Sequence, residues 1–198
     1  VTVAESLRPD SEITFFLPTI ACWGGWGEMF SADLKSAKQE AAAFEHWEQT
    51  GLCRLHESSR KSIKRSQFLQ AAWEGTDILH ISTHAHRKNG LLFEDLNRNE
   101  YPISAEDIES LFARLTRRGT NVECVIFNAC NSEAHAEAIQ NHINYSVGMQ
   151  DFIPDEAALK FSKAFYETLF DEDDITFAYD EGVYAIQIAK MEPEGEIE

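Results

Sequence analysis

The most constraining feature of the sequence is an apolar run at residues 122–127, broken only by Glu123 and followed by polar residues. A run of this length and character is typical of a strand that is buried on both faces. A second strand-like run lies at residues 77–82, and apolar residues recur at helical spacing between and after the two runs. This alternation predicts an α/β fold in which helices cover both sides of a mostly parallel sheet.

The remaining elements follow from periodicity and turn residues. Strands are expected at 13–17, 52–57 and 145–149, a hairpin at 90–101, and a loop rich in Trp and Gly at 23–28. Helices are expected at about 30–47, 66–73, 104–119 and 132–142, and in a last helix that Pro154 opens. We expect residues 1–190 to form a single domain and residues 191–198 an acidic, flexible tail.

Composition and charge exclude several classes of protein. The 17 Lys and Arg against 34 Asp and Glu give a net charge of −17, which does not neutralise a phosphate backbone, so no nucleic acid is expected as a partner. No apolar run approaches the roughly 18 residues of a membrane span. The four cysteines have no CxxC spacing, which indicates reduced thiols in the cytoplasm. The chain begins with Val1 rather than Met, which suggests a fragment or a processed product.

Two of the predicted strands end in residues that carry chemistry. The strand at 77–82 leads to His84, and the strand at 122–127 leads to Cys130. Reactive groups gather beyond the carboxyl ends of parallel strands, so adjacent strands would bring the two side chains together. An imidazole takes the proton of a thiol and later returns it to a leaving amine. The backbone N–H groups of Ala85 and Cys130 are candidates for an oxyanion hole.

Other cysteines and histidines have simpler interpretations. A buried structural thiol is the alternative for Cys130 and the expectation for Cys22, Cys53 and Cys124. His80 is expected to be a hydrogen-bonded core residue, and His135 and His142 are expected at the surface. Residues 83–86 resemble the start of the metallo-β-lactamase motif HxHxDH, but Lys88 and Asn89 occupy the positions of its Asp and third His. No metal site and no cofactor are therefore predicted.

Three motifs give the sequence a family resemblance. They read His80-Ile81-Ser82-Thr83-His84-Ala85, Gly90-Leu91-Leu92-Phe93-Glu94-Asp95 and Asn128-Ala129-Cys130-Asn131-Ser132-Glu133. Over about residues 13–186 the chain resembles the CHAT family of caspase-like (clan CD) cysteine peptidases, in the short bacterial form found beside effector-associated domains. The corresponding family motifs are H-x-S-G-H-G, G-L-x-x-E-D and N-A-C-x-S-E. The chain differs in having Thr83 and Ala85 where the family has glycines.

The resemblance implies a caspase-hemoglobinase fold, a three-layer α/β/α sandwich, and hydrolysis of peptide bonds. It implies Cys130 as nucleophile, His84 as general acid and base, and the Ala85 N–H as an oxyanion donor. Relatives with this fold often recognise a basic P1 residue through an acidic pocket, for which Asp155 and Asp151 are the candidates. The alternative for Asp155 is stabilisation of the first turn of a helix.

The expected function is therefore a cytoplasmic cysteine endopeptidase that cleaves one partner protein in a bacterial defence or regulated cell-death system. Family habit suggests a gasdermin-like protein or another zymogen as the substrate, and a regulatory or sensor protein as a second partner. Residues 151–198 hold 3 basic and 14 acidic side chains, and a negative field of this kind favours a basic substrate segment. The alternative is a catalytically silent interaction module with the same fold.

Overall fold

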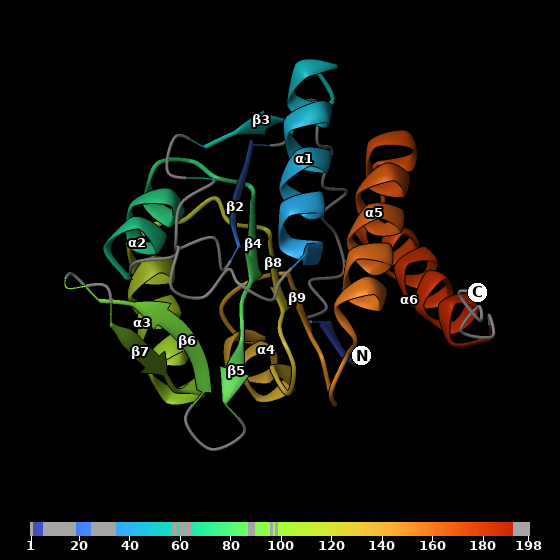
Figure 1. The fold of residues 1–198 in the computed structure, drawn as a ribbon. Helices are drawn as coiled ribbons and strands as arrows, with labels where there is room; N and C mark the ends of the chain where they lie inside the picture. Colours follow the sequence, from blue (N-terminus) through green and yellow to red (C-terminus); the bar gives the residue numbers. More distant parts are fainter. Residues whose placement is uncertain are drawn as a thin grey trace.

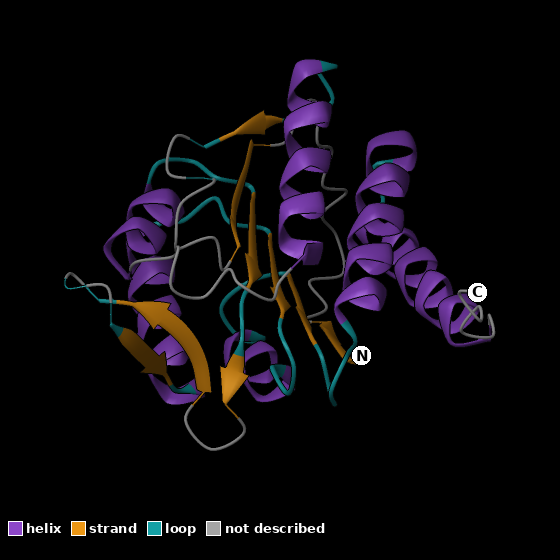
Figure 2. Ribbon diagram, viewed as in Figure 1, coloured by secondary structure: helices purple, strands orange, loops and turns teal. Residues whose placement is uncertain are grey.

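The computed structural model describes residues 2–5, 19–24, 35–56, 59, 65–86, 90–95, 97 and 99–191. A six-stranded sheet in the order β1-β9-β8-β4-β2-β3 forms its centre (Figures 1 and 2). The strands are β1 (Thr2–Glu5), β2 (Thr19–Gly24), β3 (Arg54–Leu55), β4 (Ile78–Ser82), β8 (Cys124–Asn128) and β9 (Tyr145–Gly148). All neighbours pair in parallel except β1, which is antiparallel to β9. The predicted, mostly parallel sheet is confirmed.

Helices cover both faces of this sheet, as the three-layer α/β/α prediction requires. One layer contains α1 (Lys35–Gln49), α5 (Asp155–Glu172) and α6 (Ile175–Met191), and the other contains α2 (Arg65–Trp73), α3 (Ala105–Arg118) and α4 (Glu133–Ile139). Alternate residues of a strand point to opposite faces, and each face has its own core. Leu79, Ile81, Val125 and Phe127 pack on the α2–α4 side. Ile78, Cys124 and Ile126 pack on the α1–α5–α6 side.

A small antiparallel sheet lies beside the main one and contains β5 (Ala85–His86), β6 (Gly90–Glu94) and β7 (Glu100–Ile103). The predicted hairpin at 90–101 corresponds to β6 and β7, which pair directly. The predicted start of α3 is also confirmed, because the Ser104 side chain accepts the Asp107 N–H in a capping box. Gly119 ends the same helix with a left-handed conformation.

The structure differs from the predicted elements in several places. Residues 19–24 form strand β2, so the expectation of a loop beginning at residue 23 is wrong there. Strand β1 and helix α6 were not predicted, and α4 is shorter than the predicted helix at 132–142. The predicted strand at 13–17, residues 30–34 of the predicted first helix and the tail after residue 191 lie outside the described residues. Among the described helices, none is both long and apolar enough to cross a membrane.

Candidate active site

Two adjacent strands, β4 and β8, lead to the predicted dyad. They pair in parallel with Ser82 opposite Asn128. His84 follows Ser82 by two residues, and Cys130 follows Asn128 by two residues. Both residues therefore leave the sheet at the same edge, on strands that lie about 4.8 Å apart. The side chain of His84 is exposed and that of Cys130 is half-buried.

The loop after β8 holds Cys130 against the chain that follows β9. The Ile153 N–H donates to Cys130 Sγ at 3.5 Å, and the thiol donates to the Ile153 carbonyl oxygen at 3.7 Å. The Asn131 N–H donates to the carbonyl oxygen of Asp151 at 3.4 Å. These contacts hold the Cys130 side chain against the segment between β9 and α5.

Ser132 fixes the same loop to the end of β9. Its buried hydroxyl donates to the Phe127 carbonyl oxygen at 2.8 Å and accepts the Met149 N–H at 2.9 Å. The Glu133 N–H donates to the Met149 carbonyl oxygen at 3.1 Å. Gly148 permits this close approach, because a Cβ there would lie 2.8 Å from the Ser132 carbonyl oxygen and 2.9 Å from Glu133 Cα. The backbone of the Cys130 loop is thus held on both sides.

The backbone of His84 is fixed by β6. The Thr83 hydroxyl donates to the Leu92 carbonyl oxygen at 2.8 Å, and the Leu92 N–H donates to the His84 carbonyl oxygen at 3.0 Å. Because the Leu92 N–H bonds to the His84 carbonyl oxygen, the next pair, Ala85 with Leu91, is the non-hydrogen-bonded kind. The Ala85 N–H therefore points away from β6.

Thr83 and Ala85 do not need the conformational freedom of glycine. Among the described residues, the non-glycine residues with positive φ are Asn131 at 52° and Asp173 at 54°. Thr83 and Ala85 therefore have φ values that ordinary L-residues adopt. Their side chains stand where the CHAT family, which the sequence resembles, has glycines, and they do so without backbone strain.

Two further cysteines in the described part of the chain are structural, as predicted. Cys124 is fully buried in β8, and burial, with a smaller effect from Glu123, raises the pKa of its thiol far above the usual range. Burial, with a contribution from Glu48, raises the pKa of Cys53 to about 12. Both thiols stay protonated at neutral pH and are poor nucleophiles. The side chain of Cys22 lies outside the described residues.

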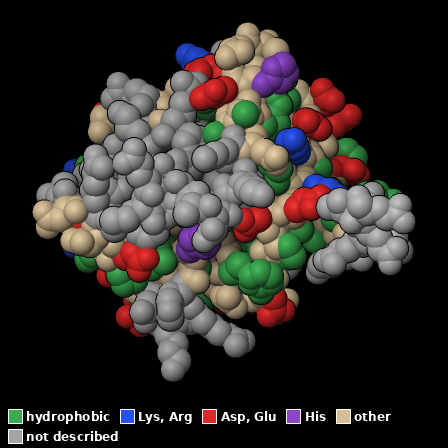
Figure 3. Space-filling view, viewed as in Figure 1, with side chains coloured by type: hydrophobic (Ala, Val, Ile, Leu, Met, Phe, Trp, Pro, Cys, Tyr) green, Lys and Arg blue, Asp and Glu red, His purple; other side chains and the backbone are tan. Residues whose placement is uncertain are grey.

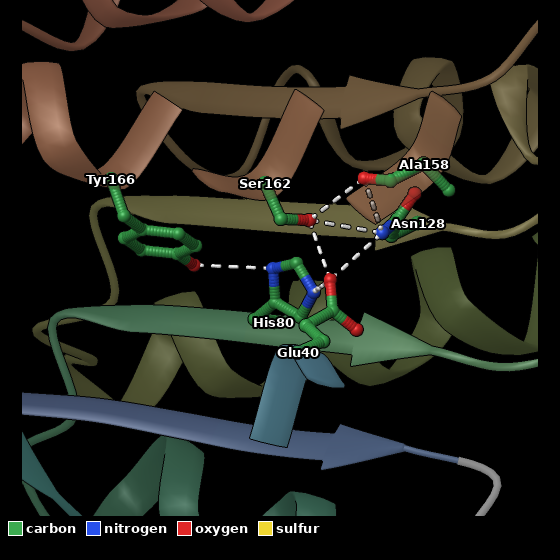
Figure 4. A network of polar contacts seen from close by, with 6 residues as sticks. All are labelled: Glu40, His80, Asn128, Ala158, Ser162 and Tyr166. Carbon is green, nitrogen blue, oxygen red and sulfur yellow. Dashed lines mark hydrogen bonds and ion pairs between the residues drawn. The ribbon is translucent and has the colours of Figure 1, made fainter. Parts of the chain in front are cut away.

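A buried polar cluster lies where α1 and α5 meet strands β4 and β8 (Figure 4). Glu40 of α1 is at its centre, and its Oε1 accepts from His80 Nε2 at 3.1 Å, from Asn128 Nδ2 at 3.0 Å and from the Ser162 hydroxyl. The Tyr166 hydroxyl lies 3.2 Å from His80 Nδ1 on the other side of the ring. We call these residues (Glu40, His80, Asn128, Ser162 and Tyr166) the Glu40 cluster.

The Glu40 carboxylate is ionised in this cluster. Burial alone would raise its pKa, but the charge of His80 and hydrogen bonds from His80, Ser162 and Ser82 outweigh burial and lower it. The prediction that His80 is a hydrogen-bonded core histidine is confirmed. Glu40 was not predicted, although an acidic residue on the apolar face of an expected helix is a recognisable signal of a buried polar contact.

The expectation that His135 lies at the surface is wrong. His135 is buried under the small sheet, where its Nε2 lies 3.1 Å from the Ile103 carbonyl oxygen and its ring packs near Phe127. Burial lowers its pKa, and the Ile103 contact only partly opposes this effect, so the ring is neutral at pH 7. His142, in contrast, is partly exposed.

The predicted S1 candidates lie on the segment that contacts Cys130. Asp151 and Asp155 are both exposed, and Asp155 is the first residue of α5. Between them Phe152 is 78% exposed, although its neighbour Ile153 touches the Cys130 sulfur. Figure 3 shows further acidic side chains on the side of the molecule formed by α5 and α6. Sequence reasoning missed Phe152, which has no pattern that distinguishes it from a core residue.

The described residues contain no group of three or more His, Cys, Asp or Glu side chains placed to hold a metal ion.

Comparisons with known proteins show which family the chain resembles. The CHAT domain matches residues 24–181. A Roc-COR-CHAT protease from an unknown prokaryotic organism is 37% identical over 122 residues, which is 60% of this chain and 12% of that protein. A probable protease from Gillisia limnaea is 35% identical over 112 residues, or 56% of this chain and 20% of that protein. The chain thus corresponds to a small part of each relative.

Solved structures share the fold at low sequence identity. The complex of the pro- and mature domains of Porphyromonas gingivalis RgpB has a TM-score of 0.55 and 10% identity, over 87% of this chain and 43% of that one. The Arg-specific cysteine proteinase gingipain R (RgpB) has a TM-score of 0.52 and 13% identity, over 90% of this chain and 44% of that one. The caspase-like fold predicted from the sequence is confirmed.

Proposed function

Because the chain belongs to the CHAT domain family, we propose that it is a cysteine endopeptidase with Cys130 as nucleophile and His84 as general acid and base. The observation that carries the proposal is the parallel pairing of Ser82 with Asn128. This register brings His84 and Cys130 out of the sheet at one edge, two residues beyond the pair.

In this mechanism the imidazole of His84 takes the proton of the Cys130 thiol as sulfur attacks the carbonyl carbon of the scissile bond. The C–N bond then breaks, and the imidazolium gives its proton to the departing amine. The acyl group stays on sulfur as a thioester. Water attacks the thioester carbon while His84 takes its proton, and the C–S bond breaks to release the carboxylic acid product. The imidazolium then returns the proton to the thiolate, which restores the enzyme.

Two backbone N–H groups are suited to stabilise the tetrahedral oxyanion. The Ala85 N–H points away from β6, and its residue needs no left-handed conformation. Within the described residues, no acceptor takes the Cys130 N–H. These observations support Ala85 and Cys130 as the donors of the oxyanion hole.

A basic P1 residue is the favoured substrate feature. Asp151 and Asp155 are exposed beside the segment that contacts the thiol, and a carboxylate there attracts an Arg or Lys side chain. The gingipain that shares the fold is named as Arg-specific. Asp155→Ala and Asp151→Ala should lower kcat/KM for peptides with P1 Arg more than for uncharged P1 residues. Glu156→Ala removes a neighbouring acidic side chain in the same helix turn, and it should change kcat/KM for neither kind of peptide. Equal effects of the three substitutions on kcat/KM would reject the pocket.

The proposed activity is tested with an arrayed peptide library and the purified chain. Turnover by the parent that is lost in Cys130→Ala and in His84→Ala supports the endopeptidase. The buried thiol of Cys124 provides the control, because Cys124→Ser should leave the set of cleaved peptides unchanged. Absence of turnover with every peptide and with candidate protein substrates would favour an interaction module with a peptidase fold.

The biological setting belongs to the same proposal. We place the activity in a single domain at residues 1–190, with a gasdermin-like protein or another zymogen as substrate, in bacterial defence or regulated cell death in the cytoplasm. The Roc-COR-CHAT relative is much longer than this chain, which supports a regulatory partner domain. Expression of the parent and of Cys130→Ala in bacteria, followed by mapping of new protein N-termini, tests this setting. If every new N-terminus found with the parent also appears with Cys130→Ala, the result would contradict this setting.

A further inference from the structure

The Glu40 cluster occupies the layer of the molecule immediately beneath the proposed dyad. Asn128 of β8 donates to Glu40 Oε1 at 3.0 Å, and Ser82 of β4 also hydrogen-bonds to this carboxylate. Ser82 and Asn128 are the last paired residues of the two strands. His84 and Cys130 lie two residues further on, a distance of about 6–7 Å along an extended chain.

One carboxylate therefore connects four elements. Glu40 comes from α1, His80 and Ser82 from β4, Asn128 from β8, and Ser162 from α5. The sequence separations of these contacts from Glu40 range from 40 to 122 residues. Asn128 adds a direct bond to the Ser162 hydroxyl at 3.0 Å. Apolar side chains make no directed bonds, so they do not fix the relative position of separate elements in this way.

Aromatic rings enclose the cluster and exclude water from it. The His80 ring lies 5.3 Å from the Phe44 ring and 5.6 Å from the Tyr166 ring. Glu40 is 4% exposed and His80 is 1% exposed. Buried charges of this kind contribute little to stability compared with well-packed apolar residues, and their attested role is to specify one arrangement. Stability alone does not account for an ionised carboxylate at this place.

We propose that Glu40 is a positioning residue, whose buried carboxylate holds β4 against β8 and so fixes the separation of His84 and Cys130. The inference rests on the proposed function, since it assigns the cluster a role in that dyad. Catalytic groups must be held within about 0.5 Å of their productive geometry. A misplacement of about 1 Å costs about a hundredfold in rate.

Two substitutions at Glu40 test the proposal by the split between kcat and KM. Glu40→Ala removes the oxygen that accepts from both the Asn128 amide and the His80 ring, and should lower kcat by about 10- to 100-fold while KM stays within about twofold. Glu40→Gln has the same shape and keeps one oxygen acceptor, so it should retain an intermediate kcat. Glu40→Gln also tests the proposal if the Glu40→Ala variant does not fold.

The control is Leu115→Ala, which removes a fully buried side chain of α3 on the opposite face of the sheet. This variant should unfold at a lower temperature than the parent but keep its kcat when assayed below that temperature. If Glu40→Gln keeps the kcat of the parent, or if Leu115→Ala loses as much kcat as Glu40→Ala, the positioning role is wrong.

A second readout separates failure of this proposal from failure of the proposed function. The rate of Cys130 alkylation by iodoacetamide needs no substrate, and it should fall at least fivefold in Glu40→Ala if the dyad is displaced. Turnover by the parent with unchanged kcat in Glu40→Ala overturns only the positioning role. Absence of turnover by the parent overturns the proposed function, and the alkylation rate then decides whether Glu40 positions the two residues. An unchanged alkylation rate in that case overturns the positioning role as well.

Discussion

Gly148 provides a sharp test of how the Cys130 loop is held, because it lies where β9 meets the start of α4. A Cβ at this position would lie 2.8 Å from the Ser132 carbonyl oxygen and 2.9 Å from both Glu133 Cα and Ala136 Cβ. Two of these three atoms belong to the backbone, so no flexible side chain relieves the overlap. Ordinary contact begins at 3.4 Å, which means that Gly148→Ala moves the loop and α4 by about half an ångström.

The size of the effect follows from this displacement. Overpacking of a close contact costs about 1–3 kcal/mol of stability. If a displacement of about 1 Å costs a hundredfold in rate, half of it costs about tenfold in kcat. We therefore expect Gly148→Ala to lower kcat about tenfold for a peptide that the parent cleaves, measured well below the melting temperature of the variant.

Ile108→Val is the matched control for this prediction. It shortens a fully buried side chain of α3 and costs about 0.5–1.5 kcal/mol, and Ile108 is not among the nearest neighbours of a Cβ at position 148. We expect its kcat to equal that of the parent. A Gly148→Ala variant with the expected stability loss and an unchanged kcat would refute the claim that this contact positions the nucleophile.

Three further predictions concern thiol reactivity, pH and helix capping. In the native protein iodoacetamide should label Cys130 before Cys53 or Cys124, because burial raises the pKa of both other thiols, and peptide mapping that finds Cys124 labelled first would contradict this. Since the folded-state pKa of Glu40 is below its ordinary value of 4.5, its ionised form contributes fully above that pH, and this stability is lost as the pH falls through the lower value. Between about pH 5 and pH 3 the melting temperature of the parent should therefore fall more steeply than that of Glu40→Gln, and parallel curves would argue against the assignment. Ser104→Ala should lose about 1 kcal/mol of stability in denaturant unfolding with unchanged turnover, because it removes the N-cap of α3.

The elements that the sequence predicted well are those in which local signals agree. The strands near 77–82 and 122–127 have apolar runs, and α3 has a capping box at one end and Gly119 at the other. Strand β2 was missed because Gly24 and the glycines after it read as a loop, whereas its neighbours β3 and β4 impose an extended conformation. Helix α6 was missed because Gly182 interrupts its pattern. That glycine packs against the ring of Phe161, which leaves no room for a Cβ.

The site was predictable to the extent that it depends on strand ends. His84 and Cys130 follow two predictable strands, so parallel pairing alone suggests that they meet. The Glu40 cluster depends instead on contacts between residues 40 to 122 positions apart, and no local pattern encodes which helix face meets which strand. His135 was misplaced for the same reason, because only the packing of the small sheet buries it.

In the proposed mechanism His84 activates Cys130, and the rate of Cys130 alkylation by iodoacetamide at pH 7 tests this role most directly, without a known substrate. The parent and His84→Ala are compared, and Cys124→Ser provides a variant that lacks an unrelated thiol. We expect His84→Ala to slow the reaction of Cys130 by about tenfold or more and Cys124→Ser to leave it unchanged. Equal alkylation rates in the parent and in His84→Ala would contradict the dyad.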